Sequence, residues 1–233
     1  MNLFYSAKIA GPTHQLNEEE SRHIAKVLRL KPGDTIFLTD GNGNLFETVI
    51  SENNGKSCIV SIVNSLMEYN KRSFRLHIAI APTKSTDRFE WFLEKATEIG
   101  IDEITPLICE HSERKHIKTE RLNKVIIAAM KQSLKAYLPT FNEPVKFSDF
   151  TRQSHTGQKM IAWCKEDSTE ELKKNYIKGS DALILIGPEG DFSPEEVMTA
   201  IHNGFVPVNL GKSRLRTETA GIIACHTCNL INA

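Results

Sequence analysis

The first seventy residues carry short apolar runs separated by turn-forming Gly and Asn, a pattern typical of β-hairpins. Three strands and two intervening turns are predicted, at residues 35–40, 45–51 and 57–63, with the turns at 41–44 and 53–56. A short helix is predicted ahead of them over residues 18–30, with Ile24, Val27 and Leu28 on its apolar side. Several hairpins and one helix favour a small β-barrel over residues 1–70.

From residue 72 to residue 233 the pattern changes to apolar runs that alternate with amphipathic helices, which indicates a parallel α/β sheet. The predicted strands cover residues 76–81, 103–108, 160–164, 182–186 and 205–210. The run 182–186 is apolar throughout, as expected of a strand that is covered on both faces. Residues 138–158 are weakly patterned and are expected to form a loop.

Two helices of this second half have recognisable ends. The first runs to Ile99 before the stop at Gly100, and Asp87 and Glu90 are spaced as a capping box near its start. The second is predicted over residues 120–137, because apolar and basic side chains recur there on separate stripes at helical spacing. Such a helix can pack against a core and still present positive charge to a partner.

Composition narrows the class of protein. The chain has 233 residues, 40% hydrophobic and 25% charged, which argues against a mainly disordered, collagenous or disulfide-scaffold protein. No apolar run approaches the roughly 20 residues that span a bilayer, and the first residues show no secretory signal. The five Cys residues are scattered and odd in number, which favours reduced thiols in a cytoplasmic protein.

Charge is balanced overall but not locally. The 29 Lys and Arg residues equal the 29 Asp and Glu residues in number. The segment from Arg114 to Lys135, however, contains seven basic residues and one acidic residue, Glu120. This basic segment is either the footprint of phosphate contacts on nucleic acid or an ordinary solvated helix face, and the segment alone does not decide between them.

Two loops, at residues 186–196 and 210–220, each follow a predicted strand, contain glycine and lead into a helix. Ser193 and Glu196 are spaced as a capping box for the first helix, and Thr217 is the expected cap of the second. Glycine lets the backbone approach a ligand closely, and α/β folds bind ligands at the carboxyl ends of their strands. If the two strands are neighbours, the two loops would form one cradle for a ligand. Each loop by itself could equally be an ordinary turn between a strand and a helix.

Two other motifs carry less weight. Gly211-Lys-Ser213 resembles the end of a phosphate-binding loop, but that loop needs a glycine at the position of Val206. Cys225 and Cys228 have a metal-like spacing, yet they lie in an apolar helix without a convincing second pair of ligands. We therefore expect core thiols and no metal site.

Taken together, several segments resemble the RsmE family, the 16S rRNA uridine-N3 methyltransferases of the SPOUT (α/β knot) class. The matching segments are residues 23–29 with Gly33 and Asp34, 84–100, 112–114, Gln132 and Ser133 with Pro139, 185–190 and 210–220. The last two, separated by about 20 residues, are the most specific. Asp191 departs from the family pattern, which usually has a second glycine there.

The resemblance implies a PUA-like β-barrel that binds RNA, at residues 1–70, followed by a SPOUT methyltransferase domain with a C-terminal trefoil knot, at residues 72–233. It also implies a cytoplasmic homodimer that uses S-adenosyl-L-methionine (SAM) and methylates N3 of a uridine in 16S rRNA, within the 30S subunit. Neither a metal nor a membrane is implied. The cofactor-binding residues carried over are Trp163, Cys164, Leu185, Ile186, Gly187, Pro188, Glu189, Gly190, Leu210, Gly211, Ser213, Leu215, Arg216 and Thr217.

Methyl transfer to uridine N3 requires the N3 proton to leave, so a base, or a cation that stabilises the uridine anion, would help. The candidates are Arg216, Arg114 and Glu189, and a cation is expected to matter more because the loops are rich in Arg. The expected RNA contacts are Arg22, Lys26, Arg29, Arg114, Lys115, Arg121, Lys124 and Lys131.

Two other functions stay open on the residues alone. The chain could be a non-catalytic RNA-binding protein with a degenerate α/β domain, or a nucleotide-phosphate enzyme that uses residues 211–213. Calorimetry with SAM and with ATP would distinguish the three.

Overall fold

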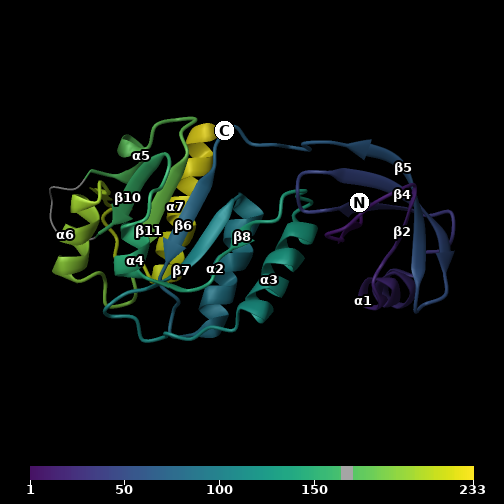
Figure 1. The fold of residues 1–233 in the computed structure, drawn as a ribbon, viewed down its shortest axis with the longest axis horizontal. Coiled ribbons are helices and arrows are strands. Elements are labelled where there is room, and N and C mark those ends of the chain that lie inside the picture. The colour runs from purple at the N-terminus through teal and green to yellow at the C-terminus, as the bar shows by residue number, and fades with distance from the viewer. Residues whose placement is uncertain (164–169) are drawn as a thin grey trace. The chain divides into compact units, whose positions relative to one another are not determined.

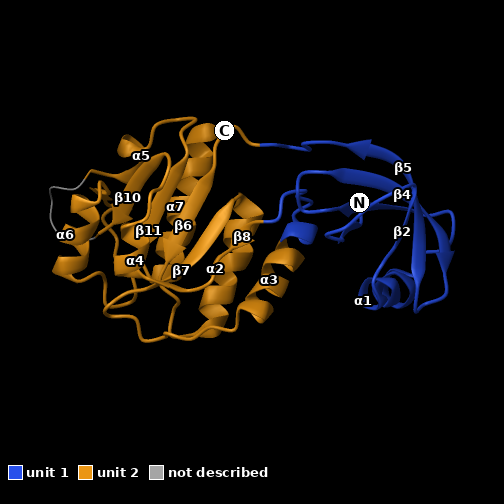
Figure 2. Ribbon diagram, viewed as in Figure 1, with its two compact units in different colours: residues 1–71, 130–138 blue, residues 72–129, 139–233 orange. Residues whose placement is uncertain are grey.

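The computed structural model describes residues 1–163 and 170–233, and these form two compact units. Unit 1 comprises residues 1–71 and 130–138, and unit 2 comprises residues 72–129 and 139–233 (Figure 2). The division near residue 70 expected from the sequence places residues 130–138 in the second domain, whereas in the structure they cluster with unit 1.

Unit 1 is built on a five-stranded sheet in the order β1-β3-β4-β5-β2. Its strands are β1 (Leu3–Tyr5), β2 (Thr13–Gln15), β3 (Thr35–Thr39), β4 (Leu45–Asn53) and β5 (Cys58–Leu66). The three predicted strands are confirmed as β3 to β5, and the β1–β3 pair is parallel while the others are antiparallel. Because no pairing between β1 and β2 closes the sheet in the described part of the chain, the expected barrel is not confirmed.

The predicted helix at residues 18–30 has two parts. The helix α1 (Glu18–Arg22) is capped by Asn17 and continues as a π-helical segment, η1 (His23–Leu28). A π-helix winds with i→i+5 hydrogen bonds, so side chains leave the α-helical phase. Ile24 is fully buried as expected, but Val27 is 65% exposed, so its expected place on the apolar side was wrong.

The basic helix also ends earlier than predicted. The helix α3 (Thr119–Gln132) stops because Leu134 takes a positive φ of 56°, where the right-handed helix cannot continue. The residues beyond it then pair with a turn of unit 1: Gly43 N–H donates to the Ala136 carbonyl at 2.9 Å, and Leu138 N–H donates to the Gly41 carbonyl at 2.8 Å.

Unit 2 is a parallel sheet in the order β12-β10-β11-β6-β7-β8, with β9 paired to β7 (Figure 1). The strands are β6 (Leu76–Ile80), β7 (Glu103–Ile108), β8 (Thr140–Phe141), β9 (Val145–Lys146), β10 (Gln158–Ala162), β11 (Ala182–Ile186) and β12 (Val206–Val208). All five residues of β11 are buried, as the apolar run predicts. The predicted parallel α/β sheet is confirmed.

Helices cover both faces of this sheet. On one side α2 (Thr86–Ile99) packs with α7 (Thr217–Asn232), which contacts β6 and β11. The other side holds α4 (Phe147–Thr151) and α6 (Pro194–His202), whose apolar side chains join those of Leu183 and Leu185 in one core cluster. A short helix, α5 (Leu172–Asn175), precedes β11. None of the described helices is long and apolar enough to cross a bilayer.

Three local expectations need correction. Residues 138–158 are not a simple loop, since they contain β8, β9 and α4, which are too short to show a periodic pattern. At α2 the N-cap is Ser85 without a side-chain cap bond, and Glu90 pairs with Arg121 instead of closing a capping box. Thr217 is the first residue of α7 rather than its cap, which is Arg216.

Other caps and the cysteines follow the sequence. Ser193 and Glu196 form the predicted reciprocal capping box of α6. Cys225 and Cys228 are fully buried in α7, and burial raises the pKa of the Cys228 thiol to about 12. Both are therefore core thiols, as expected.

Gly221 of α7 allows the helix to lie close against its neighbours. A Cβ at this position would lie 2.6 Å from Phe92 Cε2 and 2.8 Å from Ile80 Cδ1. We expect Gly221→Ala to destabilise the protein by about 1–2 kcal/mol, because the overpacking outweighs the gain in helix propensity. Urea unfolding measures this, and Phe92→Leu in the same chain should relieve part of the loss. An unchanged or raised midpoint for Gly221→Ala alone would contradict the close packing.

Candidate functional site

A cavity of about 460 Å³ lies where β10 and β11 end and the loop after β12 begins. Both glycine loops line it, so the expected cradle forms. Nine of the residues expected to bind the cofactor belong to its lining: Ile186, Gly187, Pro188, Glu189, Gly190, Leu210, Ser213, Leu215 and Thr217. Its volume falls within the range of small-molecule sites, roughly 300–1,000 Å³.

The first loop follows β11 and has little space for side chains. A Cβ on Gly187 would lie 3.1 Å from the Phe192 ring, and one on Gly190 would lie 3.1 Å from His111 Cβ. Asp191 adopts a φ of 63°, a left-handed conformation that Asp tolerates better than most residues. Its carboxylate accepts the Phe192 N–H at 2.8 Å, which holds the turn where the family pattern has glycine.

The second loop connects β12 to α7. Gly211 has a φ of 107°, and its N–H donates to Asn209 Oδ1 at 3.0 Å. Five lining residues were not expected from the sequence: Ala162, Asp191, Lys212, Arg214 and Ala220. Lys212 and Arg214 alternate with expected residues of the same loop, so the loop motif itself was the signal that could have found them.

Some of the expected cofactor residues do not line this cavity. Leu185 is buried inside β11, and Trp163 packs against the apolar core of unit 2. Gly211 lies in the loop but outside the lining, and Cys164 lies outside the described residues. Arg216 is exposed at the start of α7, where it lines an adjacent hollow with Arg88 and Trp91.

Arg114 and Glu189 meet at the backbone that follows β6. Arg114 donates to the Lys84 carbonyl at 2.6 Å and to the Thr83 carbonyl at 3.2 Å. The Glu189 carboxylate accepts the Lys84 N–H at 2.9 Å. Glu189 therefore ties this backbone segment to the loop of the cavity, which it lines, whereas Arg114 ties the same segment to the residues that follow β7.

His111 anchors the first loop from outside. Its Nδ1 donates to the Asp191 carbonyl at 2.9 Å, and this hydrogen bond raises the pKa of the imidazole above its usual 6.5. The raised pKa means that the contact contributes its full stability below pH 6.5 and loses it as pH rises through the folded-state value. We expect the Tm difference between the protein and His111→Ala to be larger at pH 6 than at pH 8.5. A difference independent of pH would show that protonation plays no part.

The expected RNA contacts fall in both units. On unit 1, Lys26 and Arg29 are exposed, Arg22 pairs with Glu18 at 2.5 Å, and Lys131 pairs with the half-buried Glu20 at 2.5 Å.

On unit 2, Arg121 pairs with Glu90 at 2.6 Å and Lys124 with Glu120 at 3.5 Å, while Lys115 is exposed. No group of three or more His, Cys, Asp or Glu side chains in the described ranges could hold a metal ion.

Comparison with known proteins identifies the family. The profile of the RNA methyltransferase domain matches residues 70–229, and that of the RNA methyltransferase PUA domain matches residues 16–63. Ribosomal RNA small subunit methyltransferase E of Mesomycoplasma hyopneumoniae is 31% identical over 88% of this chain and 89% of its own length. The chain belongs to the ribosomal RNA small subunit methyltransferase E family.

Solved structures agree with the methyltransferase E family. A structure from Porphyromonas gingivalis described as an rRNA methyltransferase is 44% identical, with a TM-score of 0.93 over 100% of this chain and 98% of that one. A Legionella pneumophila structure, described as a methyltransferase in complex with SAM, is 29% identical, with a TM-score of 0.89 over 99% and 98% of the two chains. The resemblance drawn from the sequence is thereby confirmed.

Proposed function

We propose that this chain transfers the methyl group of SAM to N3 of a uridine in 16S rRNA. The observation that carries the proposal is the cavity in which both glycine loops of the SAM-dependent methyltransferase E family meet. The protein is an rRNA methyltransferase, and SAM is its methyl donor. The specific atom and nucleotide are the finer part of the proposal.

The residues of the cavity fit this cofactor. Gly187 and Gly190 leave little room for a side chain against Phe192 and His111, so the loop presents backbone at these two positions. Backbone amides and carbonyls suit the adenine and ribose, and the apolar Ile186, Leu210 and Leu215 provide contact area. When bound, SAM supplies an electrophilic methyl group on a sulfonium, which needs neither a metal nor a covalent enzyme intermediate.

The chain's own residues must orient the uridine and handle the charge that forms when N3 loses its proton. Arg114 is committed to the carbonyls of Thr83 and Lys84, and we assign it a positioning role. Arg216 is exposed beside the cavity and forms no ion pair within the described residues. We assign its guanidinium to stabilise the uridine anion, beside Lys212 and Arg214, which line the cavity itself, while Glu189 holds the backbone at Lys84.

The remaining features of the family complete the proposal. They are a trefoil knot in unit 2, a PUA-like RNA-binding role for unit 1, a homodimer, an assembled 30S subunit as substrate and a cytoplasmic location. The match to the RNA methyltransferase PUA domain supports the role of unit 1, and the other features are what membership of the family implies.

RNA affinity should reflect phosphate contacts. We expect the logarithm of the rRNA binding constant to fall linearly with the logarithm of the salt concentration. Lys26→Ala should reduce this slope by about one, because Lys26 is exposed and available to phosphate. Lys131→Ala is the matched control: its ammonium already pairs with Glu20, so the slope should hardly change. Equal reductions for both variants would contradict this distinction.

The reaction is tested with small subunits from cells that lack the protein. Incubation with the purified chain and methyl-labelled SAM should place one label on N3 of one uridine, as located by mass spectrometry of the rRNA. Subunits from cells that contain the protein are already methylated and should take up no label. Free 16S rRNA should react more slowly than assembled subunits. Label on another atom or another base would overturn the proposed specificity.

A further inference from the structure

A hollow of about 610 Å³ lies beside the cavity that we propose for SAM. It is lined by the starts of α2 and α7 and by the loop that precedes α7. Arg214 and Leu215 belong to the lining of both, so the hollow and the cavity adjoin along this part of the loop. A ring held in the hollow would therefore lie next to a methyl donor held in the cavity.

Glu218, the second residue of α7, lines this hollow with a carboxylate that the fold leaves unsatisfied. Only 8% of its side chain is exposed, and the nearest charged partner among the described residues is Arg88, whose Nε lies 3.8 Å away. This separation is too long for a hydrogen bond, and no other described residue donates one to the carboxylate. A buried carboxylate without hydrogen bonds costs stability, so packing of the protein does not explain its presence.

The other wall of the hollow carries an exposed aromatic ring. Trp91 of α2 is 43% exposed and lines the hollow. Exposed aromatic side chains serve as stacking platforms for nucleobases. Arg214 and Arg216 stand on the loop side, where they suit the phosphates of a nucleotide. The lining thus offers a stacking surface, a hydrogen-bond acceptor and positive charge, which together fit a nucleotide.

The acceptor favours one kind of pyrimidine. Uracil carries its single ring N–H at N3, and a carboxylate accepts hydrogen bonds but cannot donate them. N3 of cytosine is itself an acceptor, so a carboxylate would repel it. An unpaired carboxylate in the hollow therefore matches the N3–H of uracil.

We propose that the hollow receives the uracil ring of the nucleotide to be methylated, stacked on Trp91, and that the Glu218 carboxylate accepts the N3 proton. The ring has to leave its stack in the RNA to enter the hollow. A bond then forms between N3 and the methyl carbon while the bond from that carbon to the sulfonium sulfur breaks. The proton passes from N3 to Glu218 and on to water, and S-adenosylhomocysteine leaves. This inference rests on the proposed transfer to uridine N3 and adds the group that removes the proton.

Four charged side chains share the lining with Glu218. They are Asp87 and Arg88 from α2, and Arg214 and Arg216 from the loop before α7. Asp87 is the other carboxylate among them, and it is exposed whereas Glu218 is buried. Asp87 is therefore the alternative proton acceptor that the experiments have to exclude.

The first test measures binding without SAM. Titration of the full chain with uridine 5′-monophosphate should quench tryptophan fluorescence saturably, and Trp91→Phe should remove most of the quenching. Glu218→Gln should weaken binding about ten-fold, because a neutral amide accepts a weaker hydrogen bond than a carboxylate. The nucleotide methylated at N3 has no N–H there and should bind the parent chain about ten-fold more weakly. Glu195→Gln, at the second position of α6 and exposed, is the matched control and should bind as the parent chain does.

The second test measures single-turnover methylation of small subunits between pH 7 and pH 9. The rate of the parent chain should be nearly constant, because removal of the proton by a side chain does not depend on hydroxide. Glu218→Gln should be about 100-fold slower at pH 7. Its rate should rise about ten-fold per pH unit, because hydroxide then has to remove the proton. Its Tm should be no lower than that of Glu195→Gln, because the carboxylate forms no hydrogen bond with the described residues of the fold.

Three results would overturn the inference. One is absence of saturable quenching by uridine 5′-monophosphate, or full quenching in Trp91→Phe. Another is a Glu218→Gln rate with the pH profile of the parent chain, or an equal loss of rate in Asp87→Asn. The third is a Tm of Glu218→Gln far below that of Glu195→Gln, which would make the carboxylate structural. Methylation of an atom other than N3 would instead contradict the proposed function, and the titration would still report whether the hollow binds a uracil ring.

Discussion

Replacing Arg216 by Ala is expected to lower the single-turnover rate of methylation by about 100-fold, or roughly 2.7 kcal/mol in transition-state free energy. Arg216 occupies the N-cap position of α7, directly before Thr217, which lines the cavity between the two glycine loops that we propose for SAM. The loss should appear in the rate at saturating substrate, because a cation that meets charge formed only during reaction does not contribute to ground-state binding. Arg216→Lys should recover part of the rate.

Arg88→Ala is the matched control, since Arg88 lines the same hollow beside Arg216. It should keep the rate within a few-fold. If Arg216→Ala retains full single-turnover methylation with normal rRNA affinity, the assignment of Arg216 fails and the charge must be stabilised elsewhere.

Gly187→Val is expected to weaken SAM binding by about 100-fold, which corresponds to roughly 2.7 kcal/mol. A Cβ at Gly187 would lie 3.1 Å from the Phe192 ring and 3.3 Å from the Phe192 backbone nitrogen. The backbone cannot move aside as a flexible side chain would, so the loop that carries Pro188 and Glu189 has to shift. Calorimetric titration with SAM measures the loss.

The control for this variant introduces the same side chain elsewhere in unit 2. Ala128 is exposed on α3, and Ala128→Val should leave SAM affinity unchanged. Circular dichroism should show that both variants are folded. Unchanged SAM affinity in a folded Gly187→Val protein would mean that the loop does not contact the cofactor.

The elements that the sequence predicts well are those with strong local signals. The apolar run 182–186 becomes β11, and Ser193 with Glu196 forms the expected cap. The short elements of residues 138–158 escaped prediction, because they owe their form to burial of Phe147 and Phe150 by distant residues. The π-helical winding of η1 also leaves no recognisable pattern in its six residues.

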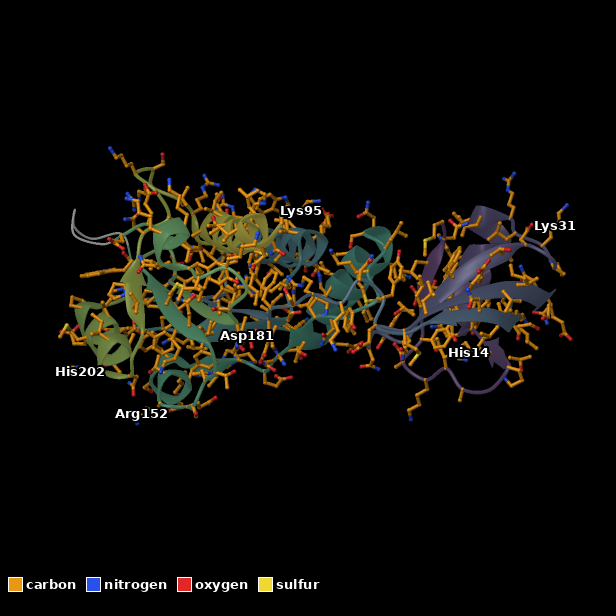
Figure 3. The ribbon with its side chains drawn as sticks, turned by 90° about the horizontal axis from the view of Figure 1, so that it is seen from above. His14, Lys31, Lys95, Arg152, Asp181 and His202 are labelled. Carbon is orange, nitrogen blue, oxygen red and sulfur yellow. The ribbon has the colours of Figure 1, made fainter. Side chains whose placement is uncertain are left out.

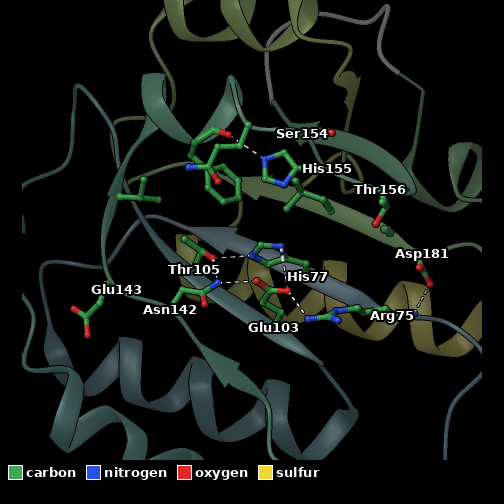
Figure 4. Close-up of a pocket in the computed structure, with 15 residues that line it drawn as sticks. Arg75, His77, Glu103, Thr105, Asn142, Glu143, Ser154, His155, Thr156 and Asp181 are labelled. Carbon is green, nitrogen blue, oxygen red and sulfur yellow. Dashed lines mark hydrogen bonds and ion pairs between the residues drawn. The ribbon is translucent and has the colours of Figure 1, made fainter.

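Two cavities of unit 2 also differ in how clearly the sequence indicates them. The cavity of about 460 Å³ was predictable because two continuous glycine loops supply most of its lining. A cavity of about 550 Å³ lies at the amino ends of β6, β7 and β11 (Figure 4). Its lining comes from separate segments and includes Arg75, Glu103, Asn142 and Asp181, so no sequence motif predicts it. Asp181, one of these lining residues, belongs to unit 2 and is labelled in Figure 3. Lys31, labelled in the same view, is an exposed residue of unit 1.

The early end of α3 has a consequence for dissecting this protein. Because residues 133–138 return to hydrogen-bond with the turn at Gly41 and Gly43, the backbone passes between the units three times rather than once. A fragment cut after residue 71 would leave the Gly43 N–H and the Gly41 carbonyl without these protein partners. Expressing unit 1 alone should therefore require joining residues 130–138 to residues 1–71. RNA-binding measurements on residues 1–71 alone would report on a unit that lacks these hydrogen bonds.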